Sequence, residues 1–217
     1  MKPTSKLHDI GQSLWLDNIT RDMLNNGTLK RYIDELAVTG LTSNPTIFDH
    51  AIKNSATYDE PIRQKAKAGE TGEKLFFGLA VEDLSRAADL FRPIHERTNG
   101  VDGWVSLEVS PLLAHDTKST LAAAKSLHQQ AGKPNLFIKI PGTPEGLPAI
   151  EESIFAGFPS TSRCSSLASN IWRRPTPICA ASNGASLPVS TRRSALSPRS
   201  SSAAGTSRSR RRCRRSW

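Results

Sequence analysis

The stretches WVSLEVS (residues 104–110) and NLFIKIP (residues 135–141) decide the fold. Both alternate aliphatic side chains with other residues at a period of two, as β-strands do. One face of each strand is therefore aliphatic. The opposite face carries a charged residue near the end of the strand, Glu108 in the first and Lys139 in the second.

Similar but shorter strand patterns occur earlier, in SLWLDN (residues 13–18) and GLTSNP (residues 40–45). Between the strands, apolar residues recur with helical spacing. Thr20 is a plausible helix N-cap, and Gly132 followed by Pro134 is a stop signal. Strands that alternate with helices of a dozen or more residues predict a parallel α/β sheet. We expect helices at residues 20–36, 46–53, 57–68, 73–97, 117–131 and 144–156.

Two architectures satisfy this pattern, an open doubly wound sheet and a barrel. A parallel sheet covered by helices on both sides is aliphatic on both faces. Here each strand has a polar group on its second face near its carboxyl end, namely Asp17, Asn44, Glu108 and Lys139. Polar inward residues at that end fit a (β/α)8 TIM barrel. We therefore predict an α/β fold that supplies about the first four strands of such a barrel.

The charge is distributed unevenly along the 217 residues. Residues 1–157 contain 17 Lys and Arg against all 20 Asp and Glu. Residues 158–217 contain 12 Arg and 16 Ser, but no Lys and no acidic residue. We predict a boundary at this point, between an α/β unit (1–157) and an Arg/Ser-rich tail (158–217).

The tail has three interpretations. It is a disordered extension, because high charge with few large apolar residues cannot form a core. It is a nucleic-acid arm that binds phosphate through SRSRRRCRRSW. Or it is translated out of frame, since Ser, Arg, Ala and Pro dominate GC-rich sequence read in the wrong frame. We favour the third, because residues 181–186 and 205–209, back-translated with suitable codons, give Ile-Glu-Arg-Arg-Ile and Trp-Asp-Val-Ala-Val in a shifted frame. The spacing of Cys164, Cys179 and Cys213 does not predict a metal site.

The most informative residue is Lys139, because an ammonium within an apolar strand is costly. Desolvation lowers the pKa of a lysine, which makes a nucleophilic amine accessible near neutral pH. Such an amine forms a Schiff base with ketones, an electron sink for carbon–carbon bond cleavage. Asp17 and Glu108 are the nearby candidates for the acid and base. The alternative is a buried ion pair of Lys139 with one carboxylate, but three charged groups at equivalent depth favour a reactive site.

The five histidines are not expected to take part in this chemistry. His8, His50, His95 and His128 follow helical or terminal patterns and are expected to face solvent, and His115 lies in a loop.

At this point the residues match a family. Four motifs in order, GQSLWLDNITR, TGLTSNPTIFDHAI, WVSLEVSP and NLFIKIPGTPEGLPAIE, closely resemble transaldolases of the longer bacterial type, from about Gly11 to Gly157. After Gly157 that family continues with a pattern like GVPVNVTLLFS, whereas this chain reads GFPSTSRCSSL. Arg163 then stands where the family has a catalytic threonine.

The resemblance implies a role for each candidate residue. Lys139 forms the Schiff base, Asp17 removes the proton of the C4 hydroxyl, and Glu108 acts with a bound water in Schiff-base formation and hydrolysis. Asn44 and Thr42 bind the hydroxyls of a dihydroxyacetone unit.

The implied reaction moves dihydroxyacetone from sedoheptulose 7-phosphate to glyceraldehyde 3-phosphate and yields erythrose 4-phosphate and fructose 6-phosphate, in the pentose phosphate pathway. The family needs no metal or organic cofactor, and its partners are sugar phosphates rather than nucleic acid. No apolar run reaches the ~18 residues of a membrane span, and the start lacks a secretory pattern, so a cytoplasmic protein is expected. We expect impaired activity in this chain. The alternative is an inactive fragment whose basic tail binds nucleic acid non-specifically.

Overall fold

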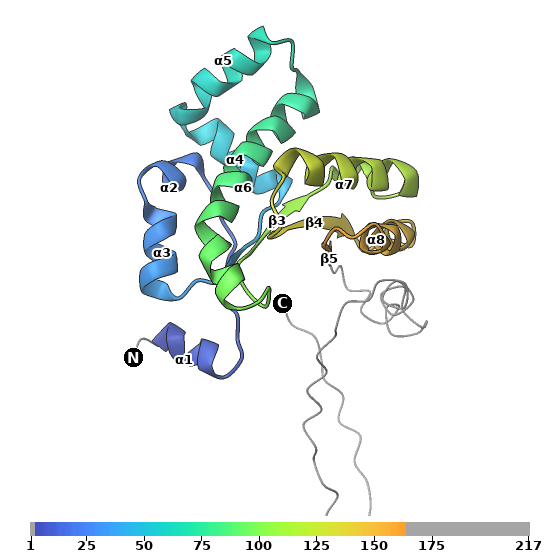
Figure 1. Cartoon of the computed structure of the whole chain (residues 1–217). Coiled ribbons are helices and arrows are strands. Elements are labelled where there is room, and N and C mark those ends of the chain that lie inside the picture. The colour runs from blue at the N-terminus through green and yellow to red at the C-terminus, as the bar shows by residue number, and fades with distance from the viewer. Residues whose placement is uncertain (1–2, 164–217) are drawn as a thin grey trace, which may run out of the picture. The chain divides into compact units, whose positions relative to one another are not determined.

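The computed structural model describes residues 3–163, and the tail interpretations concern residues that lie almost wholly outside this range. Its centre is one parallel sheet in the order β1-β2-β3-β4-β5 (Figure 1). A sheet whose strand order follows the chain is singly wound, whereas a doubly wound sheet reverses its order at a switch point. The barrel-type α/β fold predicted from the sequence is therefore confirmed. The strands are β1 (Trp15–Leu16), β2 (Gly40–Leu41), β3 (Trp104–Glu108), β4 (Leu136–Pro141) and β5 (Ser160–Arg163).

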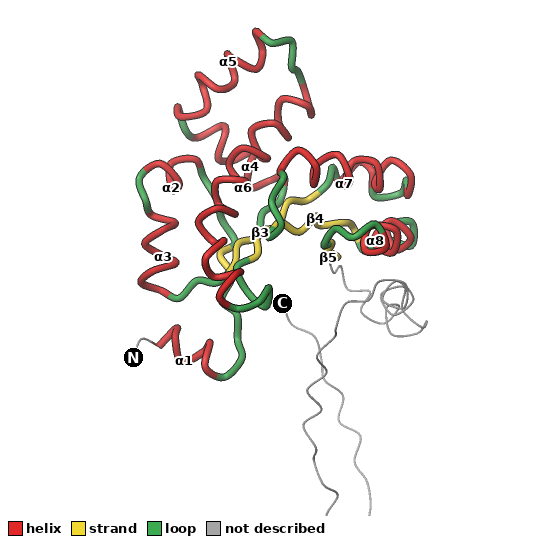
Figure 2. Tube along the Cα trace, in the orientation of Figure 1, coloured by secondary structure: helices red, strands yellow, loops and turns green. Residues whose placement is uncertain are grey.

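Helices connect the strands and pack on one side of the sheet (Figure 2). The long connection between β2 and β3 places α5 away from the strands, at the top of the view. No helix among residues 3–163 is long and apolar enough to span a membrane. The helices are α1 (Pro3–Asp9), α2 (Arg21–Asn25), α3 (Thr28–Leu36), α4 (Pro45–Asn54), α5 (Asp59–Lys67), α6 (Gly72–Arg97), α7 (Thr117–Ala131) and α8 (Gly146–Phe155), with short 3-10 turns η1 (Ala56–Tyr58) and η2 (Pro111–Leu113).

Two local signals change the element boundaries from those predicted. The helix expected at residues 20–36 divides into α2 and α3, because Gly27 adopts a left-handed φ of 77° between them. The second strand stops early because Asn44 is the N-cap of α4 and accepts a hydrogen bond from the Ile47 N–H at 3.0 Å. The predicted cap at Thr20 and stop at Gly132 are confirmed.

The fifth strand was not expected, since residues from 158 onward were assigned to the tail. Gly157, with a φ of 83°, follows the end of α8, and β5 then pairs in parallel with β4. The Ile138 N–H donates to the Pro159 carbonyl at 3.1 Å. Backbone pairing does not require an apolar side-chain pattern, so the estimate of about four strands was one too few.

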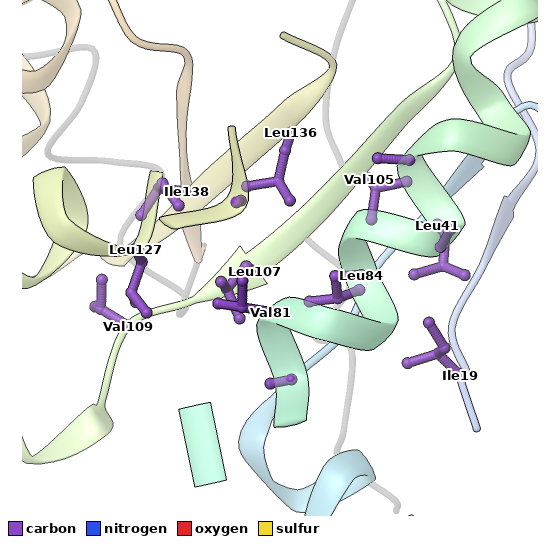
Figure 3. Close-up of a cluster of buried hydrophobic side chains, with 14 of the residues drawn as sticks. Ile19, Leu41, Val81, Leu84, Val105, Leu107, Val109, Leu127, Leu136 and Ile138 are labelled. Atoms are coloured by element: carbon purple, nitrogen blue, oxygen red, sulfur yellow. The ribbon is translucent and has the colours of Figure 1, made fainter. Parts of the chain in front are cut away.

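The aliphatic faces of the strands form the core against the helices. Figure 3 shows Val81 and Leu84 of α6 beside Val105 and Leu107 of β3. All four side chains are at most 9 % exposed, and burying each one contributes about 1.5–3 kcal/mol. This face therefore holds the helices on the sheet, as the period-two pattern predicted.

The opposite face carries an aromatic layer. The ring of Phe137 stacks on that of Trp104 at 4.0 Å and on that of Trp15 at 6.5 Å between centroids. Gly40 leaves space for this layer, since a Cβ at that position would lie 2.5 Å from the Trp15 ring. Side chains two residues further along these strands, including Lys139, therefore lie on the same face as the aromatic rings.

Two histidines lie in a different environment from the one expected. His95 packs edge-on against Trp104, with 4.6 Å between ring centroids, and His128 stacks on Phe158 at 5.2 Å. The Nε2 atom of each is buried. The expectation that these two side chains face solvent is wrong, because each closes an aromatic contact at the edge of the core.

Candidate active site

Lys139 and Glu108 form the centre of the candidate site. They are register partners on β4 and β3, and the Lys139 Nζ lies 3.2 Å from the Glu108 Oε2. The Glu108 side chain is 2 % exposed and that of Lys139 is 15 % exposed. The ion pair that the sequence offered as an alternative is therefore present, and its lysine side remains accessible to solvent.

The Lys139 ammonium also donates two hydrogen bonds to the segment after β2. One goes to the Ser43 carbonyl at 2.8 Å and the other to the Thr42 Oγ1 at 3.3 Å. The Ser106 Oγ donates to the same Thr42 oxygen at 3.0 Å. Because that oxygen accepts twice, the single proton of the Thr42 hydroxyl is left to point elsewhere.

Ser106 is the polar residue that the sequence did not select. It lies on β3 two residues before Glu108, on the same face by the period of the strand. The two-residue spacing from Glu108 was the sequence pattern that could have identified Ser106. A serine is so common on polar strand faces that only its contact with Thr42 marks it as part of the site.

Asp17 and Asn44 form a second group at the carboxyl ends of β1 and β2. Both line a cavity of about 530 Å³, which His50 and Asn54 of α4 also border. The Asp17 side chain is exposed, and its carboxylate makes no hydrogen bond or ion pair with residues 3–163. Since the Asn44 Oδ1 caps α4, its amide N–H groups are those left for a ligand.

The structure thus joins three of the five predicted residues directly and sets the other two beside them. Thr42 and Asp17 each follow a paired residue of the first two strands by one position, on the face of the aromatic layer. The cavity beside Asp17 is not lined by Lys139 or Glu108. The two groups lie at the same end of the sheet.

A buried cluster anchors the chain just after Asp17. The Arg21 Nε donates to the Asp83 carboxylate at 2.7 Å, and the Tyr58 hydroxyl donates to the same carboxylate at 2.8 Å. The Arg21 N–H donates to the Tyr58 hydroxyl at 3.0 Å. Burial raises the pKa of Asp83, although both partners oppose the shift. Arg21, only four residues from Asp17, is thereby fixed to α6.

The fold and the site define a class of protein: an α/β barrel-type chain with a lysine and carboxylates at the carboxyl ends of its parallel strands. Across residues 3–163, no three His, Cys, Asp or Glu side chains are grouped as ligands of a metal ion would be.

Comparison with known proteins gives the family. The family model for Transaldolase/Fructose-6-phosphate aldolase matches residues 14–161. Three relatives are Transaldolase 2 of Nostoc punctiforme, 43 % identical over 153 residues, Transaldolase of Arthrobacter sp., 46 % over 156, and Transaldolase of Saccharopolyspora erythraea, 48 % over 151. The chain belongs to the transaldolase/fructose-6-phosphate aldolase family, as the four motifs indicated.

The matches cover only part of the relatives. They include 70 %, 72 % and 70 % of this chain, but 40 %, 42 % and 41 % of the three relatives respectively. The chain therefore spans about two fifths of the length of the curated relatives that it matches. The family model extends four residues past Gly157, into β5.

Proposed function

We propose that this chain carries a transaldolase site in which Lys139 forms a Schiff base with a ketose phosphate. The reaction moves dihydroxyacetone from sedoheptulose 7-phosphate to glyceraldehyde 3-phosphate. The observation that supports it is the Lys139 Nζ, held 3.2 Å from a buried carboxylate at the carboxyl end of β4. Membership of the family supports the choice of substrate.

The first step is capture of the ketone. Glu108 takes a proton from the Lys139 ammonium, and the freed amine attacks C2 of the donor sugar. The C2 oxygen leaves as water after it receives two protons, one from the attacking nitrogen and one from Glu108 through a bound water. The product is a protonated Schiff base, and the same residues reverse these steps when the product is hydrolysed.

The second step is carbon–carbon cleavage. Asp17 takes the proton of the C4 hydroxyl, the C3–C4 bond breaks, and its electron pair moves into the iminium to give an enamine. Erythrose 4-phosphate leaves as the aldehyde. The enamine carbon then attacks the aldehyde of glyceraldehyde 3-phosphate, and Asp17 returns its proton to the new hydroxyl. Hydrolysis releases fructose 6-phosphate.

Thr42 and Asn44 bind the hydroxyls of the dihydroxyacetone unit in this proposal. The Thr42 hydroxyl proton is not used by its two donors, Lys139 and Ser106. The Asn44 amide N–H groups project from a helix N-cap whose oxygen is already bound. Contacts within the protein therefore already hold both hydrogen-bond donors in place before a substrate binds.

We also propose that turnover by this chain is impaired. In the described sheet, β1 and β5 each pair with one neighbouring strand only, so the described residues enclose the polar face incompletely. Water competes for hydrogen bonds at such an open face and weakens its electrostatics. The cytoplasmic location expected from the sequence remains a prediction.

Borohydride trapping with fructose 6-phosphate tests the Schiff base. The expected result is a reduced dihydroxyacetone adduct on Lys139, absent in Lys139→Ala and retained in Lys133→Ala. Lys133 is a matched control because it is a lysine near β4 that pairs with Asp89 on the surface. If circular dichroism shows a folded chain and peptide mapping finds no adduct at Lys139, the proposed function is wrong and the inert alternative holds.

A further inference from the structure

Ser160 is a polar residue on the apolar face of the sheet. Its register partner is Ile138, a fully buried core residue, so the two side chains lie on the helix-covered face. The Ser160 Oγ is buried and finds no hydrogen-bond partner among residues 3–163. Thr161, the partner of Lys139, lies on the other face. The sheet geometry at this point calls for an aliphatic residue at 160 and a polar one at 161.

We infer that one base is missing from the coding sequence within the Pro159 codon. The residues from 160 onward are then translated out of frame. In the original frame, the first of them would form a strand whose side chains fit beside β4. This inference fixes the position of the shift and the residue classes it hides, and it does not depend on the proposed function.

The genetic code makes the hidden classes predictable. In the restored frame, each codon consists of the third base of one present codon and the first two bases of the next. A TCN serine codon therefore gives NTC, which encodes Phe, Leu, Ile or Val whatever the first base is. By the same rule, Thr gives Tyr, His, Asn or Asp, a CGN arginine gives Ser, Pro, Thr or Ala, and Cys gives Leu, Met or Val.

Applied to STSRC, residues 160–164, the rule yields apolar, polar, apolar, small and apolar residues in turn. That is the period-two alternation of a strand. An apolar residue replaces the unpartnered Ser160 hydroxyl, and a hydrogen-bonding residue remains at 161 on the face of Lys139. The following Ser165 and Ser166 also become apolar.

The same rule explains the composition of the whole tail. Sixteen of residues 158–217 are serine, and each TCN codon among them hides an apolar residue. An inserted base after the second base of the Pro159 codon leaves Pro159 unchanged, because all four CCN codons encode proline. The shift therefore alters nothing before Ser160.

Reading the coding DNA from codon 157 to codon 217 is the first test. We expect TCN codons at Ser160, Ser162 and Ser165, and a shifted frame without a stop codon throughout. AGC or AGT at Ser160 and Ser162, or an early stop codon in the shifted frame, would overturn the inference, because the hidden strand would then not exist.

Expression of two matched genes is the second test. One carries a single base inserted within the Pro159 codon, and the control carries three bases there, which add one residue but keep the present frame. We expect the one-base variant to give several-fold more soluble protein and a higher denaturation midpoint by circular dichroism. Equal behaviour of the two variants would contradict the inference. Neither readout requires a Schiff base, so failure of the proposed function is distinguishable.

Discussion

Glu108 and Lys139 are register partners on neighbouring parallel strands, and their charged atoms lie 3.2 Å apart. The carboxylate is almost fully buried, whereas the ammonium retains some exposure. Removing one charge of a buried pair leaves the other uncompensated. The pair therefore contributes both to the stability of the fold and to the proposed reaction. Variants that neutralise one charge can distinguish these two roles.

Glu108→Gln is expected to slow Schiff-base formation by roughly 10²-fold or more, the usual scale for loss of a general acid or base. The amide keeps the size of the side chain but cannot take the ammonium proton. The rate of borohydride-trapped adduct formation measures this effect. Glu96→Gln is the control, since Glu96 is exposed and pairs with Arg92. Equal trapping rates in both variants would remove Glu108 from the mechanism.

Ser106→Ala is expected to slow trapping about fivefold, because it removes one hydrogen bond worth about 1 kcal/mol from Thr42. If Ser106 acts only through Thr42, the loss disappears when the same change is made in a Thr42→Val background. Ser126→Ala, on an exposed hydrogen bond to Gln130, is the matched control. An undiminished loss in the double variant would assign Ser106 an independent role.

The faces of the strands were predictable because side-chain alternation is a local property of the chain. Lys139 and Glu108 could be assigned to the same face of the sheet from period two, and the structure brings them into contact. The limits of β2 were not predictable in the same way. Asn44 fits both a strand and a helix cap, and the following Pro45 decides for the cap.

Contacts between segments that are distant in the chain could not be predicted from the sequence. Arg21, Tyr58 and Asp83 come from three elements, and no local period relates them. β5 was missed for another reason, since Ser160 breaks the apolar pattern that a core strand normally shows. Strand pairing there is carried by the backbone, which sequence patterns do not report.

Asp83→Asn is expected to lower the free energy of unfolding by about 3–5 kcal/mol, because it removes the buried charge partner of the Arg21 guanidinium and leaves only the more exposed Glu82 beside it. Asp89→Asn, on the same helix but in a surface pair with Lys133, should cost about 1 kcal/mol or less. Urea denaturation followed by circular dichroism compares them. Similar losses in the two variants would show that the cluster does not anchor the segment after Asp17.

A half-buried histidine predicts a loss of stability in mild acid. Burial lowers the pKa of His128 below its ordinary value of 6.5, so the unfolded chain binds the proton more tightly than the folded chain. The stability that the neutral His128 contributes is complete above about pH 6.5, and it is lost as the pH falls through the folded-state pKa. His128→Phe should therefore reduce the drop in urea midpoint between about pH 7.5 and 5.5. His115→Phe, whose side chain is 82 % exposed in the native chain, should leave that drop unchanged, and the opposite ranking would contradict this assignment.

Ser160→Val in the present frame tests the packing of β5 directly. The change removes a buried hydroxyl that lacks a partner among residues 3–163, and such a group costs about 1–3 kcal/mol. We expect a gain in unfolding free energy of that order, because valine adds aliphatic surface beside Ile138. Thr161→Val is the matched control, since it removes a hydroxyl from the neighbouring residue on the opposite face. A gain from Thr161→Val and none from Ser160→Val would mean that the register of β5 is shifted by one residue, which exchanges the two faces.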